Sequence, residues 1–352
     1  MEHKPVRKRR WAVAASVISL TLVLLLVVLQ ALVMPKYIGE IPEGRLIGEY
    51  YNAPSRHNVL FVGDCEVYES FSTVTLWEEY GISAYIRGSA QQLIWQSYYL
   101  LAEAIARGEQ PEAVVFNVLS MKYETPQHEE YNRMTLDDMA WSEYKLGAIR
   151  ASMTEEESLI TYLFPFLRYH SRISSLKKED FTSLFTERET ISYNGYLMQT
   201  GVVPEGERGE PASPYPDALI SDLCFDYLER MRALCEENGI TFVLIKAPTN
   251  NWKYYWYDEW DAQISVYAAS HNLPYYNFIG LDDEIGIDWS TDTYDAGVHL
   301  NVYGAEKLSS YFGEILKNEI GVSDLSDDET LSAYYAELSR RYATEKQKGS
   351  ST

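Results

Sequence analysis

Residues 58–66 read NVLFVGDCE, an apolar run that ends in a glycine and is followed by a cysteine between two acidic residues. A continuous apolar run of this length is typical of a strand that is buried on both faces, as in a parallel sheet. Three other segments share this character and are expected to be neighbouring strands: ISAYIRG (82–88), EAVVFNV (112–118) and GITFVLIKAP (239–248). A shorter segment, LPYYNFI (273–279), is a candidate fifth strand.

Segments with helical periodicity lie between these strands. Apolar residues recur at helical spacing in 91–107, and the amphipathic stretch 219–238 ends at a glycine, which is a typical helix stop. Residues 305–318 are expected to form the closing helix. Strands that alternate with helices in this way predict an α/β fold, with a largely parallel sheet flanked by helices.

The predicted α/β domain, 58–320, is interrupted between the third and fourth strands. Residues 119–215 are expected to form a helical cap over one end of the sheet, because a capping box, Thr154 with Glu157, precedes the apolar run LITYLFPFL. Residues 35–57 are expected to be a stalk. Residues 321–352 are expected to be a polar C-terminal tail that contains one helix near 329–343.

The N-terminal region has the pattern of a membrane anchor. A basic cluster at 4–10, KPVRKRR, precedes 24 residues without a charge, Trp11–Met34. About 20 helical residues span the hydrocarbon core of a bilayer, so this segment is long enough. A cleaved signal peptide is the alternative, but its apolar region is normally about 7–15 residues long. We expect an uncleaved single-pass anchor at 11–34 in the cell membrane, with residues 1–10 in the cytoplasm and the C-terminal domain outside.

Composition and charge exclude several classes of protein. Hydrophobic residues make up 46% of the chain and charged residues 23%, which suits a globular protein with a full core. The net charge of −22 repels phosphate backbones, so we expect no nucleic-acid partner. Three cysteines without CxxC spacing favour neither a disulfide framework nor a metal site. No phosphate-binding glycine loop occurs, and we expect no cofactor.

Polar and small residues follow the ends of the predicted strands. In an open α/β sheet, the ligand binds beyond the carboxyl ends of the strands. Cys65 follows the first strand, Gly88 ends the second and Asn117 ends the third. Asp295 and His299 precede the last predicted helix. A nucleophile, amide donors and an Asp/His pair are the groups that an acyl-transfer site needs.

This arrangement resembles the SGNH/GDSL hydrolase family, in particular its membrane-anchored Gram-positive members. FVGDCEVYESF (61–71) stands at the place of the family's Gly-Asp-Ser turn, and HLNVYGAEK (299–307) is the most specific part of the resemblance. The resemblance covers residues 58–118 and 240–318. It implies a flavodoxin-like parallel sheet. It also implies a catalytic triad and an oxyanion site, made by the residues Cys65, His299 and Asp295 and by Gly88 and Asn117.

The sequence departs from the family pattern in two places. Cys65 stands where the family has its nucleophilic serine, and Asp295 is one residue further from His299 than in Asp-x-x-His, which leaves Asp292 as a second candidate acid. A cysteine is chemically coherent here, because a helix start and a nearby imidazole would lower the thiol pKa. The carboxylates of Asp64 and Glu66 would raise the thiol pKa.

Each candidate also has a structural interpretation. Cys65 could be a small core residue, Gly88 a turn glycine and Asn117 a helix cap. His299 is better supported, because none of the other five histidines has a carboxylate and a predicted helix start beside it. The aromatic stretch NWKYYWYDEW (251–260) could contact sugar rings or pack under the cap.

The resemblance favours an extracytoplasmic esterase or O-acyltransferase that acts on acyl groups of a cell-surface glycan through Cys65, His299 and Asp295. Its substrate would be an acylated glycan or another ester, and a transferase would work with a membrane-bound acyl-donor partner. The alternative, from another functional class, is a catalytically silent module of the same fold that binds or positions envelope polysaccharide.

Overall fold

The structure is a computed structural model that describes residues 4–37, 41–54, 56–126, 128–186, 188–206, 219–250 and 257–349. The chain separates into two compact units. The smaller unit comprises Met1–Ile38 and Glu155–Thr190, and the larger unit comprises Gly39–Thr154 and Ile191–Thr352. The insertion expected as a cap, 119–215, is therefore divided between the two units.

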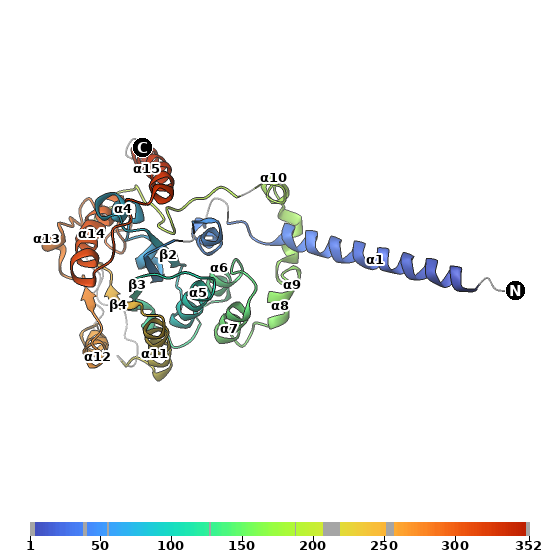
Figure 1. Cartoon of the computed structure of the whole chain (residues 1–352), viewed down its shortest axis with the longest axis horizontal. Helices are drawn as coiled ribbons and strands as arrows, with labels where there is room; N and C mark the ends of the chain where they lie inside the picture. Colours follow the sequence, from blue (N-terminus) through green and yellow to red (C-terminus); the bar gives the residue numbers. More distant parts are fainter. Residues whose placement is uncertain are drawn as a thin grey trace. The chain divides into compact units, whose positions relative to one another are not determined.

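The larger unit is built on a five-stranded parallel sheet with the strand order β2-β1-β3-β4-β5. Figure 1 labels β2, β3 and β4 of this sheet. This order is that of flavodoxin-like sheets. Each strand lies inside the segment predicted for it, so the predicted α/β fold with a flavodoxin-like parallel sheet is confirmed. The strands are β1 (Val59–Gly63), β2 (Ala84–Gly88), β3 (Ala113–Asn117), β4 (Thr241–Lys246) and β5 (Tyr275–Asn277).

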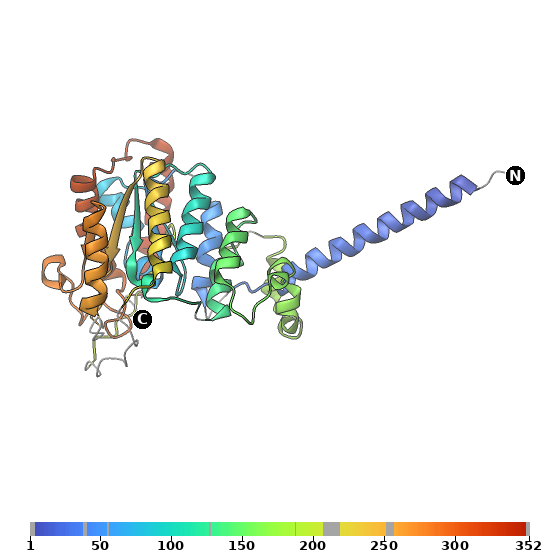
Figure 2. The ribbon, with the colours of Figure 1, turned by 90° about the horizontal axis from the view of Figure 1, so that it is seen from below.

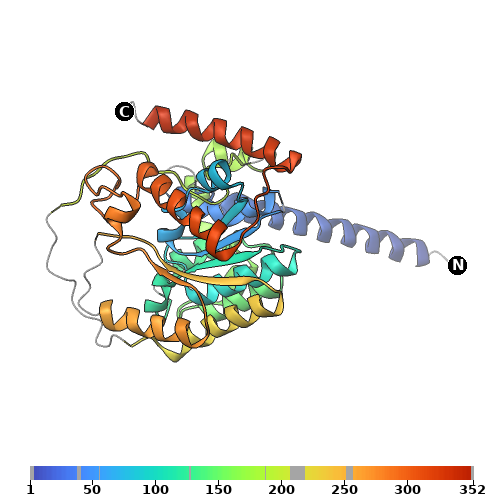
Figure 3. The ribbon, with the colours of Figure 1, turned by 60° about the vertical axis from the view of Figure 1, so that its left-hand side comes forward.

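Helices cover both faces of the sheet (Figure 3). Successive side chains of a strand point to opposite faces, so Val59 and Phe61 of β1 pack into one hydrophobic core and Leu60 and Val62 into another. The first core is closed by α3 (Cys65–Tyr68), α4 (Thr73–Tyr80), α14 (Val302–Ile315) and α15 (Glu329–Gly349). The second is closed by α5 (Ile94–Ala106), α11 (Asp222–Glu237) and α12 (Tyr257–Ser270).

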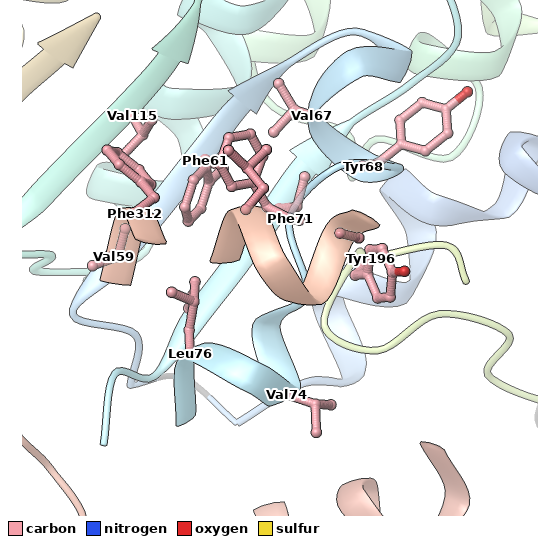
Figure 4. Close-up of a cluster of buried hydrophobic side chains, with 14 of the residues drawn as sticks. Val59, Phe61, Val67, Tyr68, Phe71, Val74, Leu76, Val115, Tyr196 and Phe312 are labelled. Carbon is pink, nitrogen blue, oxygen red and sulfur yellow. The ribbon is translucent and has the colours of Figure 1, made fainter. Parts of the chain in front are cut away.

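Aromatic rings contact one another in the first core, among aliphatic side chains (Figure 4). The ring of Phe71 lies 5.1 Å from that of Phe61 on β1 and 5.6 Å from that of Phe312 on α14. All three side chains are fully buried. These contacts join the first strand to the last helix of the predicted α/β domain. They hold together the two segments that carry Cys65 and His299.

The C-terminal segment contributes to this core through α15. Leu331, Tyr335, Leu338 and Tyr342 recur at helical spacing and are buried. The ring of Tyr335 stacks on that of Trp77 with centroids 4.2 Å apart. The predicted helix near 329–343 is thus observed as a longer element that packs on the sheet domain.

Short helices make up most of the remaining structure of the larger unit. Residues 42–52, expected to belong to a stalk, form three helical turns in which Leu46, Ile47 and Tyr50 are buried. α7 (Glu143–Ser152) packs closely on α5, and a Cβ at Gly147 of α7 would lie 2.5 Å from the Tyr99 ring of α5. These elements are η1 (Pro42–Arg45), α2 (Leu46–Glu49), η2 (Tyr50–Asn52), η3 (Val118–Lys122), α6 (Glu129–Leu136), α7 (Glu143–Ser152), α13 (Asp282–Ile285) and η5 (Leu316–Ile320).

The smaller unit contains the N-terminal helix α1 (Lys4–Val33). Its segment Arg9–Val33, with 25 residues and a mean hydropathy of 2.9, is the one helix in the described part of the chain that is long and apolar enough to cross a membrane. It fits the predicted single-pass anchor. Short helices gather around its C-terminal end (Figures 1 and 2): α8 (Leu159–Leu163), α9 (Phe166–Tyr169), η4 (His170–Ser175) and α10 (Lys178–Thr182).

Candidate active site

The carboxyl ends of the first three strands lie level with one another. Gly63 pairs with Gly88 in the β1–β2 register, and Asn117 follows the residue that pairs with Val62 in the β1–β3 register. Because all these strands are parallel, the turn that follows β1 meets the ends of β2 and β3 at the same edge of the sheet. Cys65, Gly88 and Asn117 are therefore brought to one end of the sheet.

The turn after β1 requires a glycine. Gly63 has φ +156°, and a Cβ there would lie 2.6 Å from Cγ2 of Val67. Asp64 then caps α3, with its carboxylate accepting a hydrogen bond of 3.3 Å from the amide of Glu66. Cys65 is the first residue of this short helix and is partly buried.

Cys65, His299 and Asp295 form a continuous chain of contacts. Sγ of Cys65 lies 3.1 Å from Nε2 of His299, and Nδ1 of His299 lies 2.6 Å from Oδ2 of Asp295. The backbone amide of His299 also donates to Oδ1 of Asp295 at 2.7 Å. Asp295 thus holds both the backbone and the ring of His299, and the contact at Nδ1 leaves Nε2 facing the sulfur.

Asp292, the second candidate acid, has other partners. Its carboxylate accepts hydrogen bonds from Nζ of Lys307 at 2.6 Å and from the amide of Asp288 at 2.8 Å. It is buried within the loop that precedes α14. Of the two acids left open by the sequence, Asp295 is the one that contacts His299.

The motif around His299 is held by the start of α14. Asn301 is the N-cap, and its side chain accepts hydrogen bonds from the amides of Tyr303 and Gly304. The same side chain donates to the carbonyl of Thr291 at 2.8 Å. A Cβ at Gly304 would lie 2.6 Å from the Asp292 carbonyl oxygen, so only glycine fits there. The cap and this close approach fix the loop that presents His299.

Glu69 is a site residue that the sequence analysis missed. It is buried, and its Oε2 lies 3.4 Å from Nδ1 of His299, the nitrogen that Asp295 also contacts. Burial raises the pKa of Glu69 to about 7, while His299 and a hydrogen bond from Tyr294 act in the opposite direction. Its local sequence carries no signal of this contact, because the partner, His299, lies 230 positions further along the chain.

Asn117 is engaged with carboxylates beneath the turn. Its Nδ2 donates to Oδ1 of Asp64 at 3.2 Å and to Oε2 of Glu66 at 3.0 Å, and its Oδ1 accepts from the amide of Ala247 at 3.2 Å. These bonds hold the end of β3 against the turn. An oxyanion role for Asn117 stays a prediction and would require its amide to leave these partners.

A buried ion pair lies beside Asn117. Nζ of Lys246, at the end of β4, is 2.8 Å from both carboxylate oxygens of Glu66. Both side chains are almost completely buried, so the pair neutralises charge that would be costly alone. The described residues contain no group of three His, Cys, Asp or Glu side chains that could hold a metal ion.

Of the opposing influences expected on the Cys65 thiol, those that raise its pKa prevail. Burial, and then the carboxylate of Asp64, raise the thiol pKa to about 11, although the hydrogen bond to His299 lowers it. Burial lowers the pKa of His299, but its contacts with Asp295 and Cys65 outweigh burial and raise it. Cys65 and His299 therefore keep their protons to higher pH than the free side chains do.

The aromatic stretch at 251–260 lies only partly within the described residues, since 251–256 fall outside them. Tyr257 and Trp260 begin α12 and are buried in the second core. The hydroxyl of Tyr257 accepts a hydrogen bond of 2.6 Å from Asn277. For these two residues, the packing interpretation applies.

No protein-family model and no curated protein matches the chain. Among solved structures it is similar to a candidate acylhydrolase from Bacteroides fragilis, with 12% identity and a TM-score of 0.38 over 78% of this chain and 96% of that one. It is also similar to a GDSL-like lipase from Bacteroides thetaiotaomicron, with 12% identity and a TM-score of 0.37 over 79% and 98%. At this identity the likeness concerns the fold alone, so the chemistry rests on the residues of the site.

Proposed function

We propose that this chain is a membrane-anchored acyl-transfer enzyme, an extracytoplasmic esterase or O-acyltransferase that acts on acyl groups of a cell-surface glycan. The observation that supports it most strongly is the contact chain from Cys65 through His299 to Asp295, with distances of 3.1 and 2.6 Å. These three side chains lie beyond the carboxyl ends of the strands of a parallel sheet, where ligands bind in such folds.

In the proposed reaction, the sulfur of Cys65 attacks the carbonyl carbon of the ester while the thiol proton passes to Nε2 of His299. The tetrahedral intermediate then expels the alcohol, which takes this proton from His299. A thioester remains on Cys65. Water in an esterase, or a sugar hydroxyl in a transferase, attacks the thioester and gives its proton to His299, which returns it to the thiolate. Asp295 keeps the proton of the neutral imidazole on Nδ1 throughout.

Backbone amides are the donors that we propose for the oxyanion of this intermediate. Those of Cys65 and Gly88 belong to the turn and to the strand end that meet at the site edge. We propose that they stabilise the developing charge, as amides do in other acyl-transfer sites. Asn117 joins them only when substrate binding draws its amide away from Asp64 and Glu66.

The proposed location follows from α1 and its flanks. The basic cluster at 4–10 favours a cytoplasmic N-terminus, which puts the larger unit on the outer side of the membrane. We propose a surface glycan as the substrate, because a domain held there faces the outer surface of the cell. A transferase in this place would receive its acyl group from a membrane-bound donor partner. Protease added to intact cells should then degrade the C-terminal domain, and protection of this domain would overturn the location.

Two observations favour the second candidate function, a silent module that binds envelope polysaccharide. The thiol pKa of Cys65 is raised, and the Asn117 amide is bonded to two carboxylates. A site built for binding alone would need neither a reactive thiol nor an available oxyanion donor.

Hydrolysis of p-nitrophenyl acetate by the purified full-length protein separates the two functions. The enzyme should show turnover that Cys65→Ala and His299→Ala abolish. Cys224→Ala is the matched control, because Cys224 is a buried cysteine of α11 in the second core. A silent module would show no turnover that depends on Cys65, and its glycan binding would survive Cys65→Ala.

A further inference from the structure

The smaller unit exposes an unusual number of large apolar side chains in one short segment, residues 159–185, here called the foot. Their exposed fractions run from 40% to 88%, although an apolar patch of this density is normally covered in a soluble protein. The segment also contains Tyr162 and Tyr169, which are buried, so it has an inner and an outer side. The exposed side chains are Ile160, Leu163, Phe164, Leu167, Ile173, Phe181 and Phe185.

The foot is fastened to the C-terminal end of the candidate membrane helix (Figure 2). Nη1 of Arg172 donates to the carbonyl oxygens of Val33 and Met34 at 2.7 and 2.6 Å. Val33 is fully buried, whereas Trp11 and Leu25, earlier in α1, are more than half exposed. The foot therefore surrounds the last turn of α1 and leaves the preceding turns open to lipid.

The length of α1 fixes the level of the foot relative to a bilayer. At 1.5 Å per residue, the 25 residues of Arg9–Val33 extend over about 37 Å, slightly more than the roughly 30 Å of a hydrocarbon core. Val33 must then lie at the membrane boundary when α1 spans the bilayer. Side chains that surround Val33 are held at this boundary as well.

The charge of the foot suits the surface of a bilayer. Residues 159–185 contain four basic side chains and two acidic ones, Glu179 and Asp180, whereas the whole chain has 30 basic and 52 acidic residues. Exposed apolar side chains beside basic ones are the pattern of segments that lie in the membrane interface and contact anionic headgroups. The four basic residues are Arg168, Arg172, Lys177 and Lys178.

We propose that the foot is a second membrane contact, whose apolar side chains enter the leaflet in which α1 ends while Arg168, Lys177 and Lys178 meet the lipid headgroups; Arg172 is instead paired with Asp180 and α1. The occupant is lipid, because the foot lies at the bilayer boundary whatever else the protein binds. This contact fixes the smaller unit against the membrane surface. The inference depends on α1 crossing the membrane and is independent of any activity at Cys65.

Nitroxide labels on the full-length chain in vesicles test this proposal. Leu167→Cys and Phe185→Cys place a label on the foot, and Val266→Cys places the control label on α12, where the side chain is 70% exposed. All three variants also carry Cys65→Ser. The protein with Cys65→Ser alone gives the background labelling of the buried Cys224 and Cys235. The ratio of collisions with oxygen to collisions with a water-soluble nickel chelate reports the depth of each label.

In vesicles that contain only phospholipid, the labels at 167 and 185 should show a several-fold higher oxygen-to-nickel ratio than the label at 266. Equal ratios at all three positions would overturn the proposal and leave a protein partner as the occupant of the foot. Because no catalytic readout is used, this failure is distinguishable from failure of the proposed acyl-transfer function.

A charge reversal tests the role of the basic side chains. Lys177→Glu with Lys178→Glu should reduce the depth of the label at 167 in vesicles of phosphatidylcholine and phosphatidylglycerol, and should have less effect in phosphatidylcholine alone. The label at 266 should not change in either lipid, which verifies the fold. An unchanged depth at 167 in the anionic vesicles would contradict the headgroup contact.

Discussion

Oε2 of Glu69 lies 3.4 Å from Nδ1 of His299, so two carboxylates face one imidazole nitrogen. Asp295 makes the shorter contact, at 2.6 Å, and Glu69 adds negative charge that further raises the pKa of His299. The ring of Tyr294 stacks on that of His299, with centroids 6.2 Å apart. We expect Glu69 to act as a positioning residue that tunes His299 as the proposed base.

Glu69→Gln should lower the pKa of His299, because it removes a negative charge and preserves the shape of the side chain. The pH dependence of kcat/KM should move to lower pH, with kcat at the new optimum within about tenfold of wild type. Glu306→Gln, on α14, is the control and should leave the profile unchanged. A large loss of kcat without any shift of the profile would assign Glu69 a different role.

Substitution of the two candidate acids should separate catalysis from stability. Asp295→Asn should reduce kcat by about 10⁴, since the wrong tautomer of His299 then faces Cys65. Asp292→Asn should leave most of the activity and lower the free energy of unfolding by ~1–3 kcal/mol, because it weakens a buried hydrogen-bonded carboxylate. Steady-state kinetics and denaturant unfolding measure the two effects. The reverse outcome would make Asp292 the acid of the triad.

The raised pKa values of Cys65 and His299 predict activity that increases with pH. Groups whose pKa is raised keep their protons as the pH rises, and the reaction requires the pair to have lost one of them. The rate should therefore still be increasing above pH 8 and should fall as the pH is lowered toward 6. A plateau that is already reached at pH 6 would indicate a preformed thiolate and contradict the raised thiol pKa.

Asp64→Asn should make Cys65 more reactive. Asp64 is the largest electrostatic cause of the raised thiol pKa after burial, and asparagine can still accept the capping hydrogen bond from Glu66. Alkylation of Cys65 by iodoacetamide at pH 7.5 should become faster, by about tenfold for each unit by which the thiol pKa falls. Cys235, which is buried, serves as the internal control. An unchanged rate would show that burial alone sets the pKa.

The packing of α15 can be tested on Tyr335, which is fully buried and stacks on Trp77. Tyr335→Ala should lower the free energy of unfolding by ~3–5 kcal/mol, as expected for a large aromatic core residue. Glu337→Ala, on the exposed side of the same helix, should change it by less than about 0.5 kcal/mol. Equal effects of the two substitutions in denaturant unfolding would contradict the packing of this helix on the sheet domain.

Much of the sheet could be predicted from the sequence, because a strand buried on both faces needs a continuous apolar run such as Val59–Gly63. The place of His299 was predictable as well, since the Asn301 cap and Gly304 constrain the start of the last helix. The direction of the Cys65 pKa shift could not be predicted, because the burial of the thiol depends on tertiary packing. The same holds for the hydrogen bonds of Asn117, whose carboxylate partners come from a different strand end.

The division of the insertion could not be predicted for a related reason. LITYLFPFL (159–167) has the apolar content of a core segment, and periodicity does not reveal whether such a segment packs on a sheet or beside a membrane helix. Glu69 was missed because its partner, His299, is separated from it by 230 residues of sequence. In both cases the decisive neighbour is distant in the chain.

The most direct test of the proposed mechanism is a single-turnover experiment in which wild-type protein reacts with p-nitrophenyl acetate and is quenched in acid for mass spectrometry. We expect one acetyl group per chain, on the peptide that contains Cys65, with release of one equivalent of p-nitrophenolate. His299→Ala should show much slower acylation, and Cys65→Ala none. Absence of the adduct in a wild-type protein that hydrolyses the ester, or full activity of Cys65→Ala, would contradict the mechanism.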